Sequence, residues 1–235
     1  MADTSLYSRF SELSTPLVAD ACLRLGLPLR LAPPSVRPLT MGSRLAGAAL
    51  PVRHYGSVDI FLEAMEAARL GDVLVIDNGG RTDEGCIGDL TILEAQACGL
   101  GGMIVWGCHR DSLELLQIGL PVFSMGMCPA GPQRLDPRPP DALRTAHLDG
   151  LPVTKEDVVF ADADGALFVT AGRVPDVLEA AVAIWKKERS QAQAIQSGKT
   201  LREQLRFKEY MAKRSADAAY TFRQHLRSIG GAIEE

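Results

Sequence analysis

Apolar runs separated by segments with helical spacing predict alternating strands and helices in the middle of the chain. The β-branched run Val73–Ile76 is typical of a strand covered on both faces. Further strands are expected at Met103–Trp106 and Pro121–Ser124, with helices at Asp89–Cys98 and Ser112–Ile118 between them. This order predicts an α/β fold with parallel strands.

The flanking segments extend this domain and end it in helices. Pro175 suits a first turn and the alanines after it propagate a long helix over Val174–Gln196. We therefore divide the chain into an α/β domain, residues 1–197, and a helical C-terminal arm, residues 198–235. The other expected elements are a helix at Thr15–Leu25, a strand at Ala46–Arg53, a helix from Ser57 to Leu70, a surface loop at Pro129–Pro140, a hairpin of Val158–Phe160 with Ala166–Val169, and a helix at Leu201–Arg227.

Composition narrows the class of protein. Of 235 residues, 46% are hydrophobic and 23% charged, as in ordinary soluble globular proteins. The net charge of -4 gives no reason to expect a nucleic-acid partner. No signal peptide is visible and no apolar run approaches about 20 residues, so we expect no membrane partner. Five cysteines without CxxC spacing favour a reduced, cytoplasmic setting.

The charge is unevenly spread along the chain. Between Lys186 and Arg227 there are 11 Lys and Arg against 4 Asp and Glu, a local charge of +7, so the remainder carries -11. Two interpretations stay open. The segment forms a solvated helical face, or it is a basic tail that packs against an acidic neighbouring subunit.

Two segments follow the central strands at the edge where ligands bind in open α/β sheets. They are the glycine-containing loop Asn78–Ile87 and the segment Gly107–Asp111. Gly85 and Gly88 let amides at the start of the next helix face a ligand, and a helix N-terminus suits a carboxylate. Taken alone, these glycines are also consistent with a simple tight turn.

Arg110 and Asp111, at the same edge, are candidate ligand-binding and metal-binding residues. Arg110 can hold a carboxylate or a keto-acid oxygen in a two-pronged geometry. Asp111 supplies a hard oxygen ligand for Mg²⁺ or Mn²⁺. The alternative from local sequence is that Asp111 caps the helix starting near Ser112 while Arg110 makes a surface ion pair. His109 is interpreted as a loop residue without a role as a base.

The pattern G-D-L-x8-G-x2-G-x-[IV]-V-x-G-x2-R-D, from Gly88 to Asp111, resembles the RraA-like family. That family includes class II 4-hydroxy-4-methyl-2-oxoglutarate / 4-carboxy-4-hydroxy-2-oxoadipate aldolases and regulators of RNase E activity. The likeness extends through GDVLVID, PVFSMG and DVVFADADGALFV, over about Thr15 to Ile195. It implies an α/β fold of the β/β/α swivelling-domain type, assembled as a homotrimer or a hexamer with sites between subunits.

The resemblance also implies roles for individual residues. Arg110 would bind the keto-acid end of a small 2-oxo acid and stabilise the charge of its enolate. The loop that receives that end would be formed by Gly88, Asp89, Leu90 and Thr91.

For the metal, Mg²⁺ or Mn²⁺, the resemblance implies that Asp111 is a direct ligand. Asp89 would hold a metal-bound water. A glutamate from the C-terminal helix of a neighbouring subunit would complete the site, and Glu188 is the candidate.

The function expected from this resemblance is a divalent-metal-dependent lyase. It would cleave a 4-hydroxy-2-oxo dicarboxylic or tricarboxylic acid to pyruvate, with oxaloacetate decarboxylation as a side activity. No lysine lies in the segment, which argues against a Schiff-base aldolase. The alternative is a non-catalytic binding protein like the regulators of RNase E.

Overall fold

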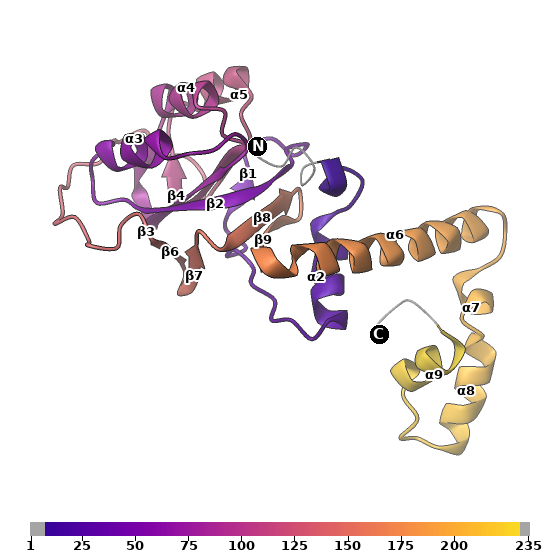
Figure 1. Ribbon diagram of the computed structural model, residues 1–235. Coiled ribbons are helices and arrows are strands. Elements are labelled where there is room, and N and C mark those ends of the chain that lie inside the picture. Colours follow the sequence, from indigo (N-terminus) through magenta and orange to yellow (C-terminus); the bar gives the residue numbers. More distant parts are fainter. Residues whose placement is uncertain (1–7, 231–235) are drawn as a thin grey trace.

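The apolar runs of the sequence form the centre of a mixed seven-stranded sheet in the computed structural model, which describes residues 8–230 (Figure 1). The strand order is β1-β5-β4-β3-β2-β8-β9. Neighbours from β2 to β5 are parallel, whereas β1, β8 and β9 pair antiparallel. The strands are β1 (Arg37–Pro38), β2 (Leu45–Arg53), β3 (Val73–Ile87), β4 (Gly102–His109), β5 (Val122–Ser124), β8 (Asp157–Asp162) and β9 (Gly165–Thr170).

Helices and a small hairpin cover the two faces of the sheet. Val73–Ile76 of β3 is fully buried because side chains pack on it from both faces. Ile76 packs with Phe61 of α3 and Ile92 of α4, whereas Val75 packs with the hairpin of β6 (Thr145–Leu148) and β7 (Leu151–Thr154). The helices are α2 (Thr15–Arg24), α3 (Asp59–Glu66), α4 (Asp89–Ala97), α5 (Ser112–Ile118), the 3-10 turn η1 (Ala171–Arg173), α6 (Val174–Gln196), α7 (Leu201–Gln204), α8 (Phe207–Ala216) and α9 (Phe222–Ile229).

The predicted elements are largely confirmed, with three corrections in the body. The helix expected from Ser57 to Leu70 spans only Asp59–Glu66, and Val58 holds its N-cap position. The loop expected at Asn78–Ile87 belongs to β3, which continues through register shifts and pairs Arg81, Gly85 and Ile87 with β4. The β6–β7 hairpin was not predicted, because its apolar positions are few and its strands have four residues each.

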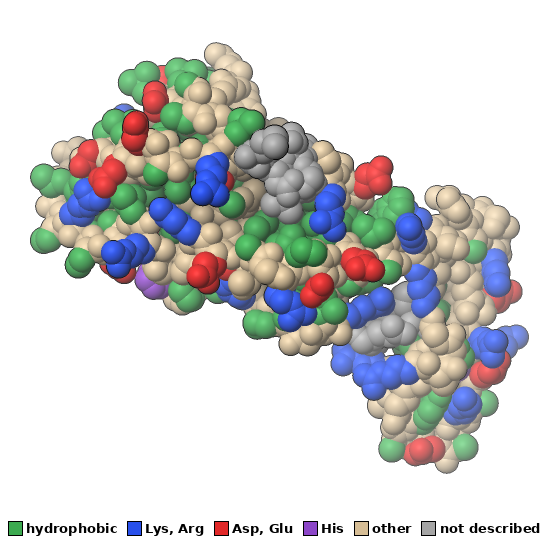
Figure 2. All heavy atoms as spheres, viewed as in Figure 1, with side chains coloured by type: hydrophobic (Ala, Val, Ile, Leu, Met, Phe, Trp, Pro, Cys, Tyr) green, Lys and Arg blue, Asp and Glu red, His purple; other side chains and the backbone are tan. Residues whose placement is uncertain are grey.

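The long helix α6 carries the C-terminal arm away from the sheet (Figure 1). Its first half packs on α2, and its far end leads into α7–α9. The single helix expected at Leu201–Arg227 is wrong, because Arg206 adopts a left-handed backbone and Asp217 an extended one. Lys and Arg side chains are frequent on the visible face of the arm (Figure 2). Within residues 8–230, no helix is long and apolar enough to cross a membrane.

Candidate functional site

The two segments singled out in the sequence lie against each other, in the carboxyl-terminal parts of β3 and β4 and just after β4. The Arg110 amide donates to the Ile87 carbonyl at 2.9 Å, which holds the end of β4 beside the end of β3. The Asp89 amide, in the first turn of α4, donates to Asp111 Oδ2 at 3.3 Å. The start of α4 and the Arg110-Asp111 pair therefore form one continuous edge.

Asp111 is held in an unusual backbone conformation. Its φ of 58° and ψ of 42° lie in the left-handed region, which costs free energy for a residue with a Cβ and occurs often at functional sites. It occupies the N-cap position of α5, but its side chain makes no capping hydrogen bond. The alternative that Asp111 caps this helix is therefore wrong. The carboxylate turns toward α4 and lies 3.5 Å from Arg110 Nε.

Gly88 makes this approach of Asp111 sterically possible. A Cβ built on Gly88 would lie 2.2 Å from Asp111 Oδ2 and 3.1 Å from Arg110 Nε. No side chain fits there without moving the carboxylate. The glycine at this position is thus required by close packing against Asp111, rather than by a tight turn.

A cavity of about 530 Å³ opens beside this edge. Gly88, Thr91 and Arg110 line it, together with the end of β3 and the loop residues 131–133. Asp89 and Asp111 lie at the edge but not on the cavity wall. The Leu90 side chain is 75% exposed and points to solvent, although its amide donates to Asp89 Oδ1 at 2.7 Å. Of the four residues of the predicted substrate loop, Gly88 and Thr91 therefore line the cavity together with Arg110.

A largely buried polar cluster lies next to this cavity, and His54 is the member that lines it. Arg134 donates to Asn78 Oδ1 at 2.8 Å and to Glu84 Oε1 at 3.1 Å. The same Asn78 oxygen lies 2.8 Å from His54 Nδ1. His54, Asn78 and Glu84 are all buried. His54 lines both the 530 Å³ cavity and a second, polar cavity of about 300 Å³ on the other side of the cluster.

The sequence alone did not reveal this cluster. Its members are 24 to 80 residues apart and form no motif. Arg134 comes from the Pro-rich segment that was expected to be a surface loop. That segment is a largely exposed loop, as expected, and it also contacts the sheet, because the Gly85 amide donates to the Ala130 carbonyl at 2.7 Å. Asn78 and Glu84 lie in a segment that was expected to be a loop, so no sequence signal indicated their burial.

His109 is also placed differently from the expectation. It is the last residue of β4 rather than a loop residue, and its side chain is buried. Nδ1 lies 2.7 Å from Ser124 Oγ and Nε2 lies 3.0 Å from Ser112 Oγ. Burial lowers the pKa of His109, so the neutral ring joins β4 to β5 and α5. Both ring nitrogens are occupied, which agrees with the absence of a role as a base.

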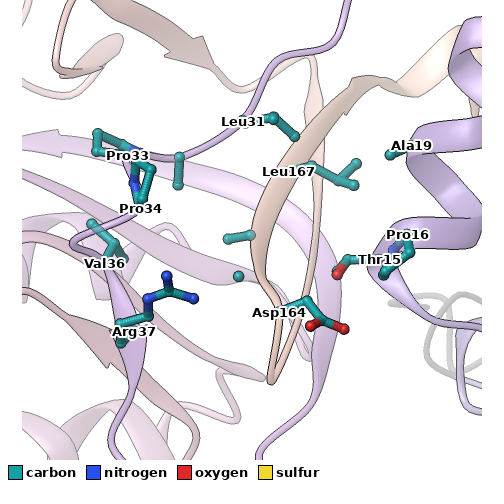
Figure 3. A pocket seen from close by; sticks show the side chains of 13 residues that line it. Thr15, Pro16, Ala19, Leu31, Pro33, Pro34, Val36, Arg37, Asp164 and Leu167 are labelled. Atoms are coloured by element: carbon teal, nitrogen blue, oxygen red, sulfur yellow. The ribbon is translucent and has the colours of Figure 1, made fainter.

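A third cavity, of about 230 Å³, lies near the β8–β9 turn and the start of α2 (Figure 3). Pro33, Pro34 and Leu167 give it mainly apolar walls, and Arg37 and Asp164 are its charged side chains. The nearby Asp162 carboxylate is already bonded to the amide and hydroxyl of Thr15, so it is not free for a ligand. Arg37 and Asp164 are therefore the charged groups that this mainly apolar cavity presents.

The carboxylates at the edge fit a hard divalent cation only if most of its ligands come from elsewhere. In the part of the chain that the structure describes, no three His, Cys, Asp or Glu side chains gather as a metal site. Asp111 offers its carboxylate, which is 35% exposed, and Asp89 lies one hydrogen bond away. Mg²⁺ commonly keeps several waters and takes one or two protein carboxylates. The donor set fits that chemistry.

Glu188 does not reach this edge within one chain. It lies in the second half of α6, and this helix packs on α2 rather than on the ends of β3 and β4 (Figure 1). Its assignment to a neighbouring subunit stays a prediction.

Comparison with known proteins places these features in a family. The family model described as RraA-like, Aldolase/RraA, matches residues 15–168. The chain belongs to the RraA-like family. The matched range contains every residue of the edge and of the buried cluster, and it ends before α6 and the arm.

Relatives are between 25% and 32% identical to the chain over the aligned residues. The protein named "Putative 4-hydroxy-4-methyl-2-oxoglutarate aldolase" from Halalkalibacterium halodurans is 25% identical over 181 residues, which cover 77% of this chain and 83% of that protein. Protein DlpA from Legionella pneumophila is 29% identical over 175 residues, 71% of this chain. The chain spans only 28% of the length of DlpA.

Solved structures confirm the RraA-like fold. A protein from Pseudomonas syringae pv. tomato has a TM-score of 0.74 and 26% identity, covering 86% of this chain and 97% of its own. RraAS2 from Streptomyces coelicolor, described as an unusual member of the RNase ES inhibitor RraA protein family, has a TM-score of 0.70 and 22% identity over 82% of this chain and 99% of its own. The second likeness concerns the fold alone.

Proposed function

We propose that the chain is a divalent-metal-dependent lyase that cleaves a 4-hydroxy-2-oxo dicarboxylic or tricarboxylic acid to pyruvate. The observation that carries this proposal is the placement of Arg110 on the wall of a 530 Å³ cavity, beside the N-terminus of α4 and next to Asp111. A cavity of this size holds a small acid. The aldolase names of the relatives point to the same class of reaction.

The chain's own residues have distinct tasks in this reaction. Arg110 is 47% exposed, so its guanidinium is accessible to the carboxylate and 2-oxo oxygen of a substrate. The N-terminus of α4 adds partial positive charge beside this site, although the Asp89 and Leu90 amides already donate to the carboxylates of Asp111 and Asp89. As the C–C bond breaks, negative charge grows on the 2-oxo oxygen, where Arg110 stabilises it. Mg²⁺ or Mn²⁺ held by Asp111 would polarise the same carbonyl as a Lewis acid. Oxaloacetate decarboxylation passes through the same enolate and is the expected side activity.

A homotrimer or hexamer is part of this proposal. Leu90 and Leu93 on α4 and Leu113 and Leu116 on α5 are between 45% and 75% exposed. These leucines lie on the two helices next to the site. A neighbouring subunit that covers them would also bring a carboxylate, with Glu188 as the candidate, to a site that has few of its own.

The test is pyruvate release from 4-carboxy-4-hydroxy-2-oxoadipate and from oxaloacetate, with Mg²⁺, with Mn²⁺ and with EDTA. Arg110→Ala should lower kcat/KM by about 100- to 1,000-fold, as loss of a charge-stabilising donor does elsewhere. Arg173→Ala is the matched control, since Arg173 is a similarly exposed arginine paired with Asp176 at the start of α6. No metal-dependent release by the wild type, or full activity of Arg110→Ala, contradicts the proposal and favours a non-catalytic regulator.

A further inference from the structure

The cavity beside Arg110 is also lined by a histidine that no other feature of the site explains. His54 follows the last residue of β2 and lines the cavity together with Gly88, Thr91 and Arg110. Its side chain is only 1% exposed. Its ring stacks on Phe61 of α3 with centroids 5.0 Å apart and planes at 20°, which fixes the ring plane.

The hydrogen bonds of the buried cluster decide which ring nitrogen carries the proton. A guanidinium has only donors, so the Asn78 atom 2.8 Å from the Arg134 nitrogen is the amide oxygen. That oxygen also lies 2.8 Å from His54 Nδ1, whereas an Arg134 nitrogen lies 3.4 Å from the same Nδ1. The shorter contact is the stronger one, and its oxygen acceptor requires a donor at Nδ1. Nδ1 therefore carries the hydrogen, and in the neutral ring Nε2 keeps its lone pair.

Nε2 is left free to act on a ligand. No described residue hydrogen-bonds to it, whereas Nδ1 is engaged. The buried polar atoms that lack a partner in residues 8–230 are Arg44 Nε, Asn78 Nδ2 and His225 Nδ1, so His54 Nε2 is not among them. Nε2 therefore has no partner among the described residues, and the residue that carries it lines both the 530 Å³ and the 300 Å³ cavity.

Charged groups of both signs lie near the His54 ring. Glu84 Oε1 lies 3.9 Å from Nδ1, but it accepts from Arg134, which also pairs with Asp136. Burial lowers the pKa of His54, and the positive charge of Arg134 adds to this effect. The Asn78 hydrogen bond and the carboxylates of Glu84 and Asp136 raise the pKa, with a smaller total effect. The ring is thus neutral at pH 7. From α3, the packed group is the uncharged Phe61.

We propose that His54 Nε2 is the base of the cleavage reaction, a role that rests on the function proposed above. Nε2 takes the proton of the distal 4-hydroxyl group, and the O–H electron pair forms the new carbonyl. The C3–C4 bond breaks, and its electrons form the enolate of pyruvate, whose oxygen Arg110 holds. The imidazolium returns its proton to C3, which yields pyruvate and the second oxo acid with no other reactant. Oxaloacetate has no such hydroxyl group, so its decarboxylation does not need His54.

The experiment compares the two substrates in His54→Gln, which keeps an amide donor toward Asn78 but has no base. The kcat for the 4-hydroxy-2-oxo acid should fall by about 100- to 10,000-fold. Oxaloacetate decarboxylation and the binding of oxalate, an enolate mimic, should stay near wild type. His147→Gln is the control, because His147 is a partly exposed histidine of β6 outside the cavity.

The pH profile gives a readout that a structural role would not move. A base must be unprotonated, so the wild-type kcat/KM should fall as pH drops below about 6.5 through the lowered pKa of His54. This fall should be absent in His54→Gln. Free imidazole should restore part of the activity of His54→Ala.

The outcomes separate the two proposals. No pyruvate release by the wild type overturns both. Release by the wild type with unchanged kcat and pH profile in His54→Gln overturns the role of His54 alone, as does an equal loss on both substrates. If neither variant folds, ring ¹⁵N shifts of the wild type still decide, since a neutral His54 with its hydrogen on Nε2 contradicts the proposal.

Discussion

The site edge and the C-terminal arm are built from contacts of opposite range in the sequence. At the site, the His54 side chain contacts Asn78, 24 residues away, and the Arg134 side chain contacts Glu84, 50 residues away. In the arm, Thr200 with Glu203 and Thr221 with Gln224 form capping boxes only three residues apart.

The two regions therefore differ in the contacts that stabilise them. Helices α7 and α9 of the arm begin at these local capping boxes, and aromatic rings join α8 to α9, such as Tyr210 and Phe222 at 4.9 Å. The site exists only when β2, β3 and the Pro-rich loop have met. We therefore expect changes at the site to disturb the whole body, and changes in the arm to stay local.

The largest effect is expected when the buried cluster loses its cation. Arg134→Met leaves the Glu84 carboxylate, which is 4% exposed, with only Arg81 Nε at 3.5 Å. The free energy of unfolding should fall by about 3 kcal/mol, the lower end for breaking a buried pair, because Arg81 remains. Urea denaturation measures it.

Arg138→Met is the matched control for this prediction. Its pair with Glu63 is exposed on both sides, at 42% and 49%, so its loss should leave stability unchanged. Equal stability of the two variants would contradict the long-range character of the site.

A smaller effect, on activity rather than stability, is expected at Gly88. In Gly88→Ala the new methyl group must displace Asp111 Oδ2, which would otherwise lie 2.2 Å away. A shift of about 1 Å in a site commonly lowers the rate about 100-fold, and we expect that loss in kcat/KM for pyruvate release. Gly172→Ala, in η1, meets nothing within 4 Å and should keep full activity. Wild-type kinetics in Gly88→Ala would show that Asp111 is free to move.

The smallest effect is expected in the arm. Thr221→Ala removes the side-chain oxygen that accepts from the Gln224 amide and should destabilise α9 by about 1 kcal/mol. Hydrogen exchange of α9 amides measures this loss, and amides of β3 should show no change. Ser215→Ala, which removes only a bond to the Met211 carbonyl within α8, is the control. Faster exchange in β3 would show that the arm and the body unfold together.

Much of the fold followed from the sequence because its signals are local. The helix at Ser112–Ile118 has the predicted bounds, since Gly119 ends it with a left-handed backbone. The helix at Val174–Gln196 is confirmed for similar reasons. The predictions failed where tertiary pairing overrides local preference. The glycines of Asn78–Ile87 indicate a loop. In the structure this segment pairs with β4 through register shifts and extends β3.

The candidate site likewise has residues that the sequence predicts and residues that it does not. Gly88, Arg110 and Asp111 form a motif of fixed spacing, so the sequence by itself determined which family the chain resembles and which residues are candidates for binding the keto-acid end of a substrate. Only the tertiary structure decided the backbone strain at Asp111, the contact of the Pro-rich loop with the sheet, and the cluster that holds His54 by one nitrogen. The physical reason is the range of the interactions. The spacing of residues along a strand or a helix depends on residues that are neighbours in the sequence. Burial and the direction of a hydrogen bond depend on side chains that come into contact only after the sheet has formed.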